Sequence, residues 1–163
     1  MATDPSKYVY NHTMIRVKDP KASVEFYEKV LGMKNIYKED FESGKFTVYF
    51  FVYTDNVPET EKERKRMVFT SSGVLELTHN WGTENQADFK YCTGNDAESK
   101  GFGHIALLVD DIEAACERAE KLNVKFVKRL TDGKMKNIAF IADPDGYWVE
   151  FIQNPLISDK YAI

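Results

Sequence analysis

The stretch HTMIRVKDPKASVEFYEKVLG at residues 12–32 recurs in altered form as HIALLVDDIEAACERAEKLN at residues 104–123. Each copy starts with a histidine, runs through four residues to a valine, and then meets an aspartate. Asp19 is suited to the N-cap position of a helix, with Pro20 as the first helical residue, where its missing N–H costs nothing. Asp111 takes the same place in the second copy. The chain therefore contains a repeated unit in which a strand leads into a helix.

Both expected helices are amphipathic, which predicts that each packs on one face of a sheet. In the first helix the apolar residues at helical spacing are Val24, Tyr27, Val30 and Leu31. Gly32 suits the left-handed position that ends a helix. In the second helix the residues expected to be buried are Ile112, Ala115, Cys116, Ala119 and Leu122, and the helix is expected to stop near Asn123.

Three strand-like runs follow each helix. They are residues 33–41, 46–53 and 73–80 in the first half, and residues 124–128, 137–143 and 146–154 in the second half. Each half thus reads β-α-β-β-β, which gives an α+β protein built from two βαβββ modules. We expect one domain over residues 1–163, with modules at 8–81 and 101–155 joined by a loop at 82–100.

The two halves differ by an insertion. From His12 to Glu76 is 64 positions and from His104 to Glu150 is 46, so the first half is longer by 64 − 46 = 18. The charged stretch TDNVPETEKERKRM at residues 54–67 accounts for this difference. The polar stretch between the halves is too long for a tight turn, so it is either a functional loop or a linker that wraps over the surface, and we favour the functional loop.

Composition excludes several classes of protein. The 163 residues are 43% hydrophobic and 29% charged, which is typical of a globular chain. The net charge of −4 argues against a nucleic-acid-binding surface. The start of the sequence has no signal-peptide pattern, and no apolar run approaches the roughly 20 residues of a membrane span. Cys92 lies in a polar loop and Cys116 in a helix, which favours free thiols and a cytoplasmic protein.

Polar residues gather on one face of the expected sheets. Because side chains alternate along a strand, His12, Met14 and Arg16 share one face, and Glu76, Thr78 and Asn80 share the corresponding face of another strand. In the second half, His104 and Glu150 hold the matching positions. An ionised glutamate among apolar neighbours is costly to bury unless it is paired or bound to a cation.

Two imidazoles and two carboxylates at matched repeat positions are typical of a divalent metal site. The set His12, Glu76, His104 and Glu150 contains no thiolate, which suits Zn²⁺, Ni²⁺, Co²⁺, Mn²⁺ or Fe²⁺ at a water-bearing catalytic site. The third histidine, His79, falls on the strand face opposite Glu76. We interpret it as a packed structural residue.

At this point the sequence resembles glyoxalase I of the vicinal oxygen chelate superfamily, over about residues 8–155. The segments that carry the resemblance are TMIRVKDP, FYEKVLGM, LELTHNWGTE, GFGHIALLV, KFVK, DGKMK and FIADPDGYWVE. The resemblance implies curved mixed sheets and a homodimer in which His12 and Glu76 of one chain face His104 and Glu150 of the other across the metal.

The resemblance also implies the activity of a carbon–sulfur lyase. The hemithioacetal of methylglyoxal and glutathione is isomerised to S-lactoylglutathione through an enediolate, with Glu150 as principal base and Glu76 as its partner. The residues that the resemblance assigns to glutathione binding are Arg16, Asn80, Lys100, Lys128 and Met135. For Lys128 and the other loop lysines, a solvated loop face is an equal alternative.

Two positions depart from the animal form of this family. His12 stands where animal forms have glutamine, a histidine set common in nickel or cobalt enzymes, whereas the insertion and DGKMK resemble the longer zinc type. Zinc is therefore the preferred expectation, with nickel or cobalt as alternatives. Lys100 stands where animal forms have arginine, which keeps the charge and loses the bidentate fork for a carboxylate.

Other activities within the superfamily stay open. A ring-cleaving dioxygenase typically uses two histidines and one glutamate, so a fourth ligand counts against it. An acyl-CoA epimerase or a thiol transferase would use similar metal chemistry, although an epimerase should lack the LTHNWGTE and DGKMK segments. A metal-free binding module, with the carboxylates as polar lining of a pocket, is the alternative outside enzymes.

Overall fold

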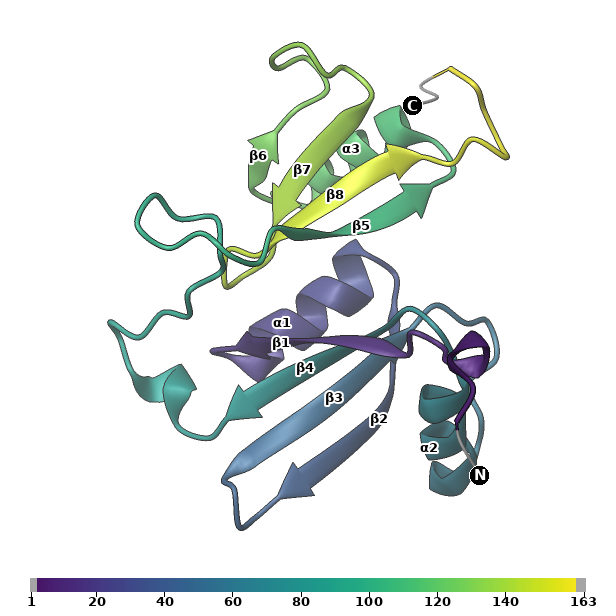
Figure 1. Ribbon diagram of the computed structural model, residues 1–163. Coiled ribbons are helices and arrows are strands. Elements are labelled where there is room, and N and C mark those ends of the chain that lie inside the picture. Colours follow the sequence, from purple (N-terminus) through teal and green to yellow (C-terminus); the bar gives the residue numbers. More distant parts are fainter. Residues whose placement is uncertain (1–2, 161–163) are drawn as a thin grey trace. The chain divides into compact units, whose positions relative to one another are not determined.

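Each half of the chain forms a four-stranded mixed sheet, and the two sheets share one strand order (Figure 1). The computed structural model describes residues 3–160. It divides into two compact units, Met1–Phe89 and Lys90–Ile163. In each unit the first strand pairs in parallel with the last, and the remaining pairs are antiparallel. The predicted βαβββ repeat is confirmed.

The first unit contains the sheet β1-β4-β3-β2 and two α-helices. Its elements are η1 (Pro5–Lys7), β1 (His12–Val17), α1 (Pro20–Glu25), η2 (Phe26–Val30), β2 (Lys34–Phe41), β3 (Phe46–Val52), α2 (Glu61–Thr70), β4 (Val74–Asn80) and η3 (Thr83–Asn85). The insertion predicted between the third and fourth strands, at residues 54–67, includes most of α2, which extends three residues past its end. Thr60 caps this helix, since its side chain accepts a hydrogen bond from the N–H of Glu63.

The second unit contains the sheet β5-β8-β7-β6 and one α-helix. Its elements are β5 (His104–Val109), α3 (Ile112–Lys121), β6 (Phe126–Lys128), β7 (Ile138–Ala142) and β8 (Trp148–Gln153). No helix within residues 3–160 is both long and apolar enough to cross a membrane.

The predicted helix caps are present in both units. The Asp19 carboxylate accepts a hydrogen bond from the N–H of Lys21 at 2.9 Å, and the Asp111 carboxylate accepts one from the N–H of Ala114 at 2.9 Å. Gly32 has a φ of +75°, as expected for the residue after a helix. Asn123, where the second helix was predicted to stop, has a φ of +55°.

The buried faces of the helices differ in part from the prediction. Leu122 was predicted to be buried but is 43% exposed, because α3 ends one residue earlier and Leu122 turns out of the helix as its C-cap. In the first helix, Tyr27 is fully buried as predicted, yet Phe26 is also buried. The π-helical turn η2, in which the Leu31 N–H bonds to the Phe26 carbonyl five residues earlier, rotates the helix face.

The two faces of the first sheet are covered by different helices. Tyr27 of the first helix packs against Phe51, with ring centroids 5.8 Å apart. On the other face, Val68 of α2 joins a buried cluster that includes Phe50 and Val74. The inserted helix therefore covers part of the same sheet face to which strand alternation assigns Glu76.

Candidate metal and catalytic site

His12 and Glu76 lie side by side on neighbouring parallel strands. His12 pairs in register with Val74, so Glu76 lies two residues further along β4 and on the same face. The Nε2 atom of His12 is 3.3 Å from Oε2 of Glu76. Asn11, just before β1, places its Oδ1 atom 2.8 Å from Nδ1 of the His12 ring.

The second unit repeats this arrangement at the same register. His104 pairs with Trp148, and Glu150 lies two residues further along β8. Nε2 of His104 is 3.1 Å from Oε2 of Glu150. The repeat found in the sequence thus extends to the geometry of the paired side chains.

A phenylalanine completes each pair, and sequence reasoning did not select it. Phe50 lies in register with Glu76, and Phe140 with Glu150. Each phenylalanine meets its histidine edge to face, with centroids 6.3 Å apart in the first unit and 5.1 Å in the second. An alignment of the runs FTVYFFVY and NIAFIAD would have placed Phe50 on Phe140, and this match could have identified the pair from the sequence.

Both carboxylates are largely withdrawn from solvent. The exposed fraction of the side chain is 15% for Glu76 and 12% for Glu150. Thr78 donates a hydrogen bond to Oε1 of Glu76 at 3.2 Å. The corresponding residue in the second unit is Ile152, whose side chain has no donor. The two carboxylates therefore share a register but differ in their polar surroundings.

The spacing of nitrogen and oxygen in each pair fits a shared cation. Two ligand atoms that each lie about 2.1 Å from a zinc-sized ion are about 3.0 to 3.4 Å apart at ordinary coordination angles. The observed separations of 3.3 and 3.1 Å fall in this range. Within residues 3–160 no three or more His, Cys, Asp or Glu side chains form a group that could hold a metal ion. Each unit thus offers two of the four predicted ligands.

Arg16 and Asn80 lie on the same sheet face as the first pair. Arg16 is exposed and pairs in register with Thr78, and Asn80 follows two residues later at the end of β4. Both residues therefore extend the polar face from Glu76 toward the carboxyl ends of these two strands.

The predicted substrate residues of the second unit have different surroundings. Lys100 and Met135 are exposed, and Met135 lies in the loop between β6 and β7. The Lys128 ammonium donates hydrogen bonds to the carbonyls of Met135 at 2.6 Å, Ile138 at 2.8 Å and Arg129 at 3.1 Å. The Lys128 side chain therefore holds together the two ends of the loop between β6 and β7. The sequence did not reveal these contacts.

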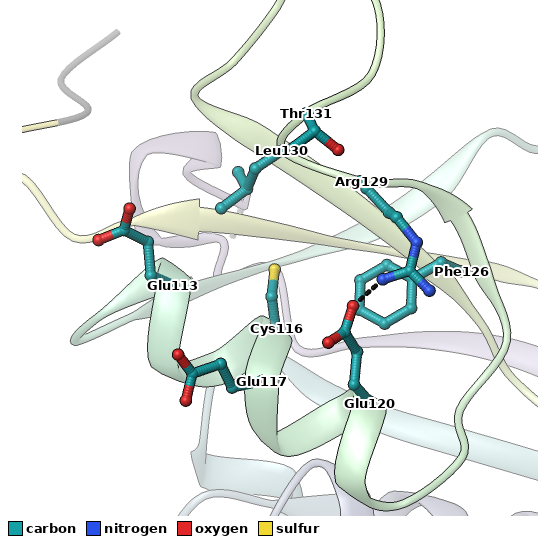
Figure 2. Close-up of a pocket in the computed structure, with 8 residues that line it drawn as sticks. All are labelled: Glu113, Cys116, Glu117, Glu120, Phe126, Arg129, Leu130 and Thr131. Atoms are coloured by element: carbon teal, nitrogen blue, oxygen red, sulfur yellow. Dashed lines mark hydrogen bonds and ion pairs between the residues drawn. The ribbon is translucent and has the colours of Figure 1, made fainter.

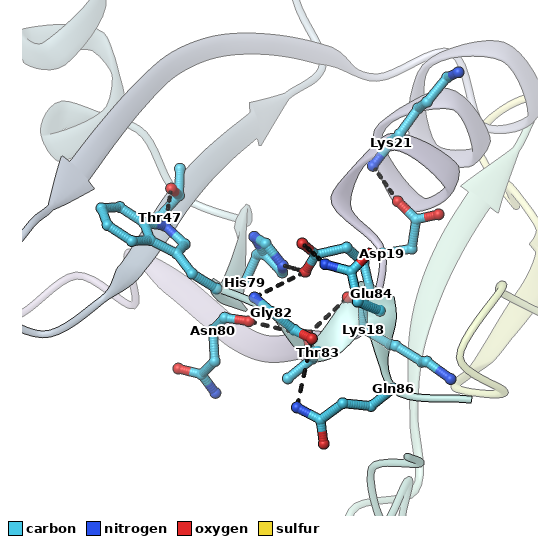
Figure 3. Close-up of polar contacts among 12 residues, drawn as sticks. Lys18, Asp19, Lys21, Thr47, His79, Asn80, Gly82, Thr83, Glu84 and Gln86 are labelled. Atoms are coloured by element: carbon cyan, nitrogen blue, oxygen red, sulfur yellow. Dashed lines mark hydrogen bonds and ion pairs between the residues drawn. The ribbon is translucent and has the colours of Figure 1, made fainter. Parts of the chain in front are cut away.

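His79 is a packed structural residue, as predicted (Figure 3). Its side chain is 9% exposed, and Nε2 lies 2.7 Å from Oε2 of Glu84, which also accepts the Gly82 N–H at 3.0 Å. Hydrogen bonds from its own backbone N–H, from His79 and from Gly82 lower the pKa of Glu84. The hydroxyl of Thr83 lies 2.8 Å from the Lys18 carbonyl and 2.9 Å from the Asn80 carbonyl. The turn after β4 is therefore fastened to the end of β1.

A groove of about 410 Å³ lies beside α3 and contains no residue of the predicted site (Figure 2). Cys116 lines it, and burial raises the pKa of this thiol. Arg129 stacks on Phe126, 4.3 Å from the ring centroid, and forms an ion pair with Glu120. Cys116 and Cys92 are both free, as predicted.

Comparison with known proteins identifies the family. Residues 9–151 match the sequence profile of the Glyoxalase/Bleomycin resistance protein/Dioxygenase superfamily. The chain belongs to this superfamily.

Two similar sequences are named lactoylglutathione lyases. A lactoylglutathione lyase of Pseudomonas aeruginosa is 55% identical over 92% of this chain and 85% of its own length. A lactoylglutathione lyase of Schizosaccharomyces pombe is 51% identical over 91% of this chain, which spans 46% of that protein. Membership of the glyoxalase superfamily thus agrees with the resemblance seen in the sequence.

A solved structure supports the same assignment at the level of the fold. The trypanothione-dependent glyoxalase I of Leishmania major superposes with a TM-score of 0.69 at 31% identity, covering 93% of this chain and 90% of its own. The glyoxalase fold that the resemblance implied is confirmed.

Proposed function

We propose that this chain is a lactoylglutathione lyase, which isomerises the hemithioacetal of methylglyoxal and glutathione to S-lactoylglutathione. The similarity to the Pseudomonas aeruginosa lyase over most of both chains supports this activity. The observation that carries the chemistry is the histidine–glutamate pair that recurs at one register in both units. Isomerisation needs a proton moved between adjacent carbons, which is work for a carboxylate beside a cation.

The proposed metal ligands are His12, Glu76, His104 and Glu150. One imidazole and one carboxylate are fewer protein ligands than a catalytic zinc site normally has, so two pairs must meet at one ion. We propose that a homodimer brings them together, with the first pair of one subunit facing the second pair of its partner. Zinc is the preferred ion and nickel or cobalt the alternatives, since nitrogen and oxygen donors suit all three.

The protein residues then have separate tasks. When bound, the ion would supply a Lewis acid that polarises the carbonyl and hydroxyl oxygens of the hemithioacetal and acidifies the C–H bond of the carbon that bears the hydroxyl. Glu150 takes the proton from that carbon, the electron pair of the broken C–H bond forms a carbon–carbon double bond, and the carbonyl π pair moves onto its oxygen. The proton then returns to the neighbouring carbon, while the original hydroxyl gives up its proton to the other oxygen and becomes the thioester carbonyl. No oxidant or reductant is required.

The surroundings of the two carboxylates support Glu150 as the principal base. The Thr78 hydroxyl occupies Oε1 of Glu76 and so fixes its orientation. Glu150 lies beside Phe140 and Ile152, whose side chains have no hydrogen-bond donor for its second oxygen. Glu76 is the partner that serves the opposite face of the substrate or the return of the proton.

Glutathione recognition is assigned to cations and amides around the pairs. Arg16 offers a bidentate fork for a carboxylate, and Asn80, on the same sheet face, offers an amide. Lys100, Lys128 and Met135 are proposed from the second unit. Because the Lys128 ammonium is held by three carbonyls, it must exchange at least one of them to meet a substrate carboxylate. A cytoplasmic location, where glutathione is abundant, is supported by the two free cysteines.

Metal removal tests the proposal directly. The protein is treated with a chelator, and consumption of the hemithioacetal is measured before and after zinc, nickel or cobalt is restored. Each ion is assayed with glutathione and with trypanothione, the thiol of the Leishmania enzyme. We expect activity with glutathione to disappear with the metal and to return with at least one ion. Undiminished turnover in the metal-free protein, or none in the reconstituted protein, contradicts the proposal.

A further inference from the structure

The amide of Asn11 links the inserted helix to the first histidine of the proposed site. Its Nδ2 atom donates to the carbonyl of Val68 at 2.8 Å and to the carbonyl of Ser71 at 2.7 Å. Its Oδ1 atom lies 2.8 Å from Nδ1 of His12. Val68 lies in the last turn of α2 and Ser71 is its C-cap, so Asn11 caps the carbonyl end of this helix.

These contacts fix which way the amide points. The NH₂ group of an asparagine has two hydrogens and its oxygen has none. Both hydrogens are directed at carbonyl oxygens, which only accept, so the oxygen faces the His12 ring. The ring nitrogen opposite that oxygen must then be the donor, and Nδ1 of His12 carries a proton.

The tautomer of His12 follows from this assignment. In a neutral imidazole with a proton on Nδ1, Nε2 presents its lone pair. That lone pair is directed toward Oε2 of Glu76, 3.3 Å away. Two acceptors at this separation require a proton or a cation between them. The same arrangement is the one in which a histidine ligates a metal through Nε2.

We propose that Asn11 is a positioning residue that holds His12 in its Nδ1-protonated tautomer, and that α2 holds Asn11 in the orientation required. This inference rests on the proposed function only in naming the metal that His12 binds. It gives the insertion of the first unit a task at the site, although none of its residues is a proposed ligand.

The second unit provides a control within the same molecule. Gly103 precedes His104 and has no side chain, so no amide from that position reaches the His104 ring. Asn95 is a matched residue, part-buried like Asn11, and its amide donates to the carbonyl of Gly103. The Asn95 amide therefore bonds to the backbone just before its histidine, whereas the Asn11 amide also faces its histidine ring.

The test measures the tautomer and the metal affinity separately. Long-range ¹⁵N–¹H spectra of the imidazole-labelled, zinc-free protein report which nitrogen of each histidine carries a proton. Zinc affinity is measured by competition with a chromophoric chelator. In the wild-type protein we expect a protonated Nδ1 at His12. Asn11→Ala should lose this fixed signature and bind zinc about 10- to 100-fold more weakly. Asn95→Ala should leave the His12 signature unchanged and zinc affinity within about twofold.

A second variant separates positioning from folding. Asn11→Asp keeps an acceptor for the His12 ring but removes both donors to the carbonyls at the end of α2. If Asn11 acts through His12, this variant retains the Nδ1-protonated signature that Asn11→Ala loses, even where stability falls in both. A protonated Nδ1 and wild-type zinc affinity in Asn11→Ala overturn the inference. If the wild-type protein binds none of zinc, nickel and cobalt, the proposed function fails, and the His12 tautomer in the metal-free protein still decides this inference.

Discussion

The two units build the same half-site in different surroundings. In both, a histidine on the first strand lies beside a glutamate two residues further along the last strand, with a phenylalanine opposite. In the first unit, Asn11 contacts the histidine and Thr78 contacts the glutamate. The equivalent positions of the second unit hold Gly103 and Ile152. The duplicated backbone thus places the same two residue types at the same register in both units. The polar neighbours in the first unit constrain its carboxylate more than the second carboxylate is constrained.

The inserted helix is the other difference between the units. α2 packs on the sheet face that carries Glu76, and Val68 and Phe50 share its buried cluster. α3 packs on the face opposite Glu150, since the Ile112 N–H donates to the Gln153 side chain, which points away from that face. Within the described residues 3–160, the first unit therefore has helices on both faces of its sheet, and the second unit has one on a single face.

Replacement of the two glutamates should give the largest difference in activity between the two units. We expect Glu150→Gln to keep its fold and lose about 10³-fold or more in kcat, because it removes the proposed base. Glu76→Gln should lose less, because its carboxylate is already engaged by Thr78. Steady-state kinetics with circular dichroism and bound-metal analysis measure both variants. Wild-type turnover in Glu150→Gln would remove Glu150 from the mechanism, and a larger loss in Glu76→Gln would reverse the assignment.

The two phenylalanines test the effect of the inserted helix on stability. Phe50→Ala should lower the free energy of unfolding by about 3–5 kcal/mol, as expected for a buried phenylalanine. Phe50 is stacked on Tyr37 and also meets Phe69, with centroids 6.0 and 5.8 Å away. Phe140→Ala should lie at the lower end of that range, because no inserted helix covers its face. Urea unfolding of both variants decides the order, and a greater loss for Phe140→Ala contradicts it.

Thr78 tests the polar difference between the carboxylates. Thr78→Val removes one hydrogen bond to Glu76 at nearly constant shape. Because Glu76 is then less well oriented, zinc binding should weaken by about 1 kcal/mol, or about fivefold in affinity. Ile152→Val is the matched control, since it trims the same register position of the second unit without removing a donor. Chelator competition measures both variants. Equal zinc affinities for the two would show that Thr78 does not orient Glu76.

The smallest expected effect is a pH dependence at the pair His79–Glu84. The pKa of Glu84 is lowered in the folded protein, so its carboxylate contributes stability above the ordinary glutamate pKa of about 4.3, and this contribution is lost as pH falls through the lowered value. Wild type should therefore exceed Glu84→Gln in unfolding free energy near pH 7. The difference should shrink below about pH 4. Urea unfolding at several pH values measures it, and a difference that grows toward acid contradicts the assignment.

Much of the fold could be predicted because its signals are local. Asp19 and Asp111 mark helix starts by capping, and alternation along β1 and β4 places Ile15 and Leu77 on the buried face. The error at Leu122 has a local cause as well, since a spacing pattern does not show at which residue a helix turns into its cap. The π-helical turn at Phe26 escaped the pattern because a helical period assumes regular geometry.

The sequence by itself determined the duplicated modules, their order of elements and the matched positions of histidine and glutamate, since alternation and capping act over a few residues. Only the tertiary structure decided the neighbours of these side chains. Asn11 meets carbonyls 57 and 60 positions away, and Trp81 meets Thr47 from 34 positions away. Such contacts depend on strand register and on how an inserted helix packs, which no local pattern specifies.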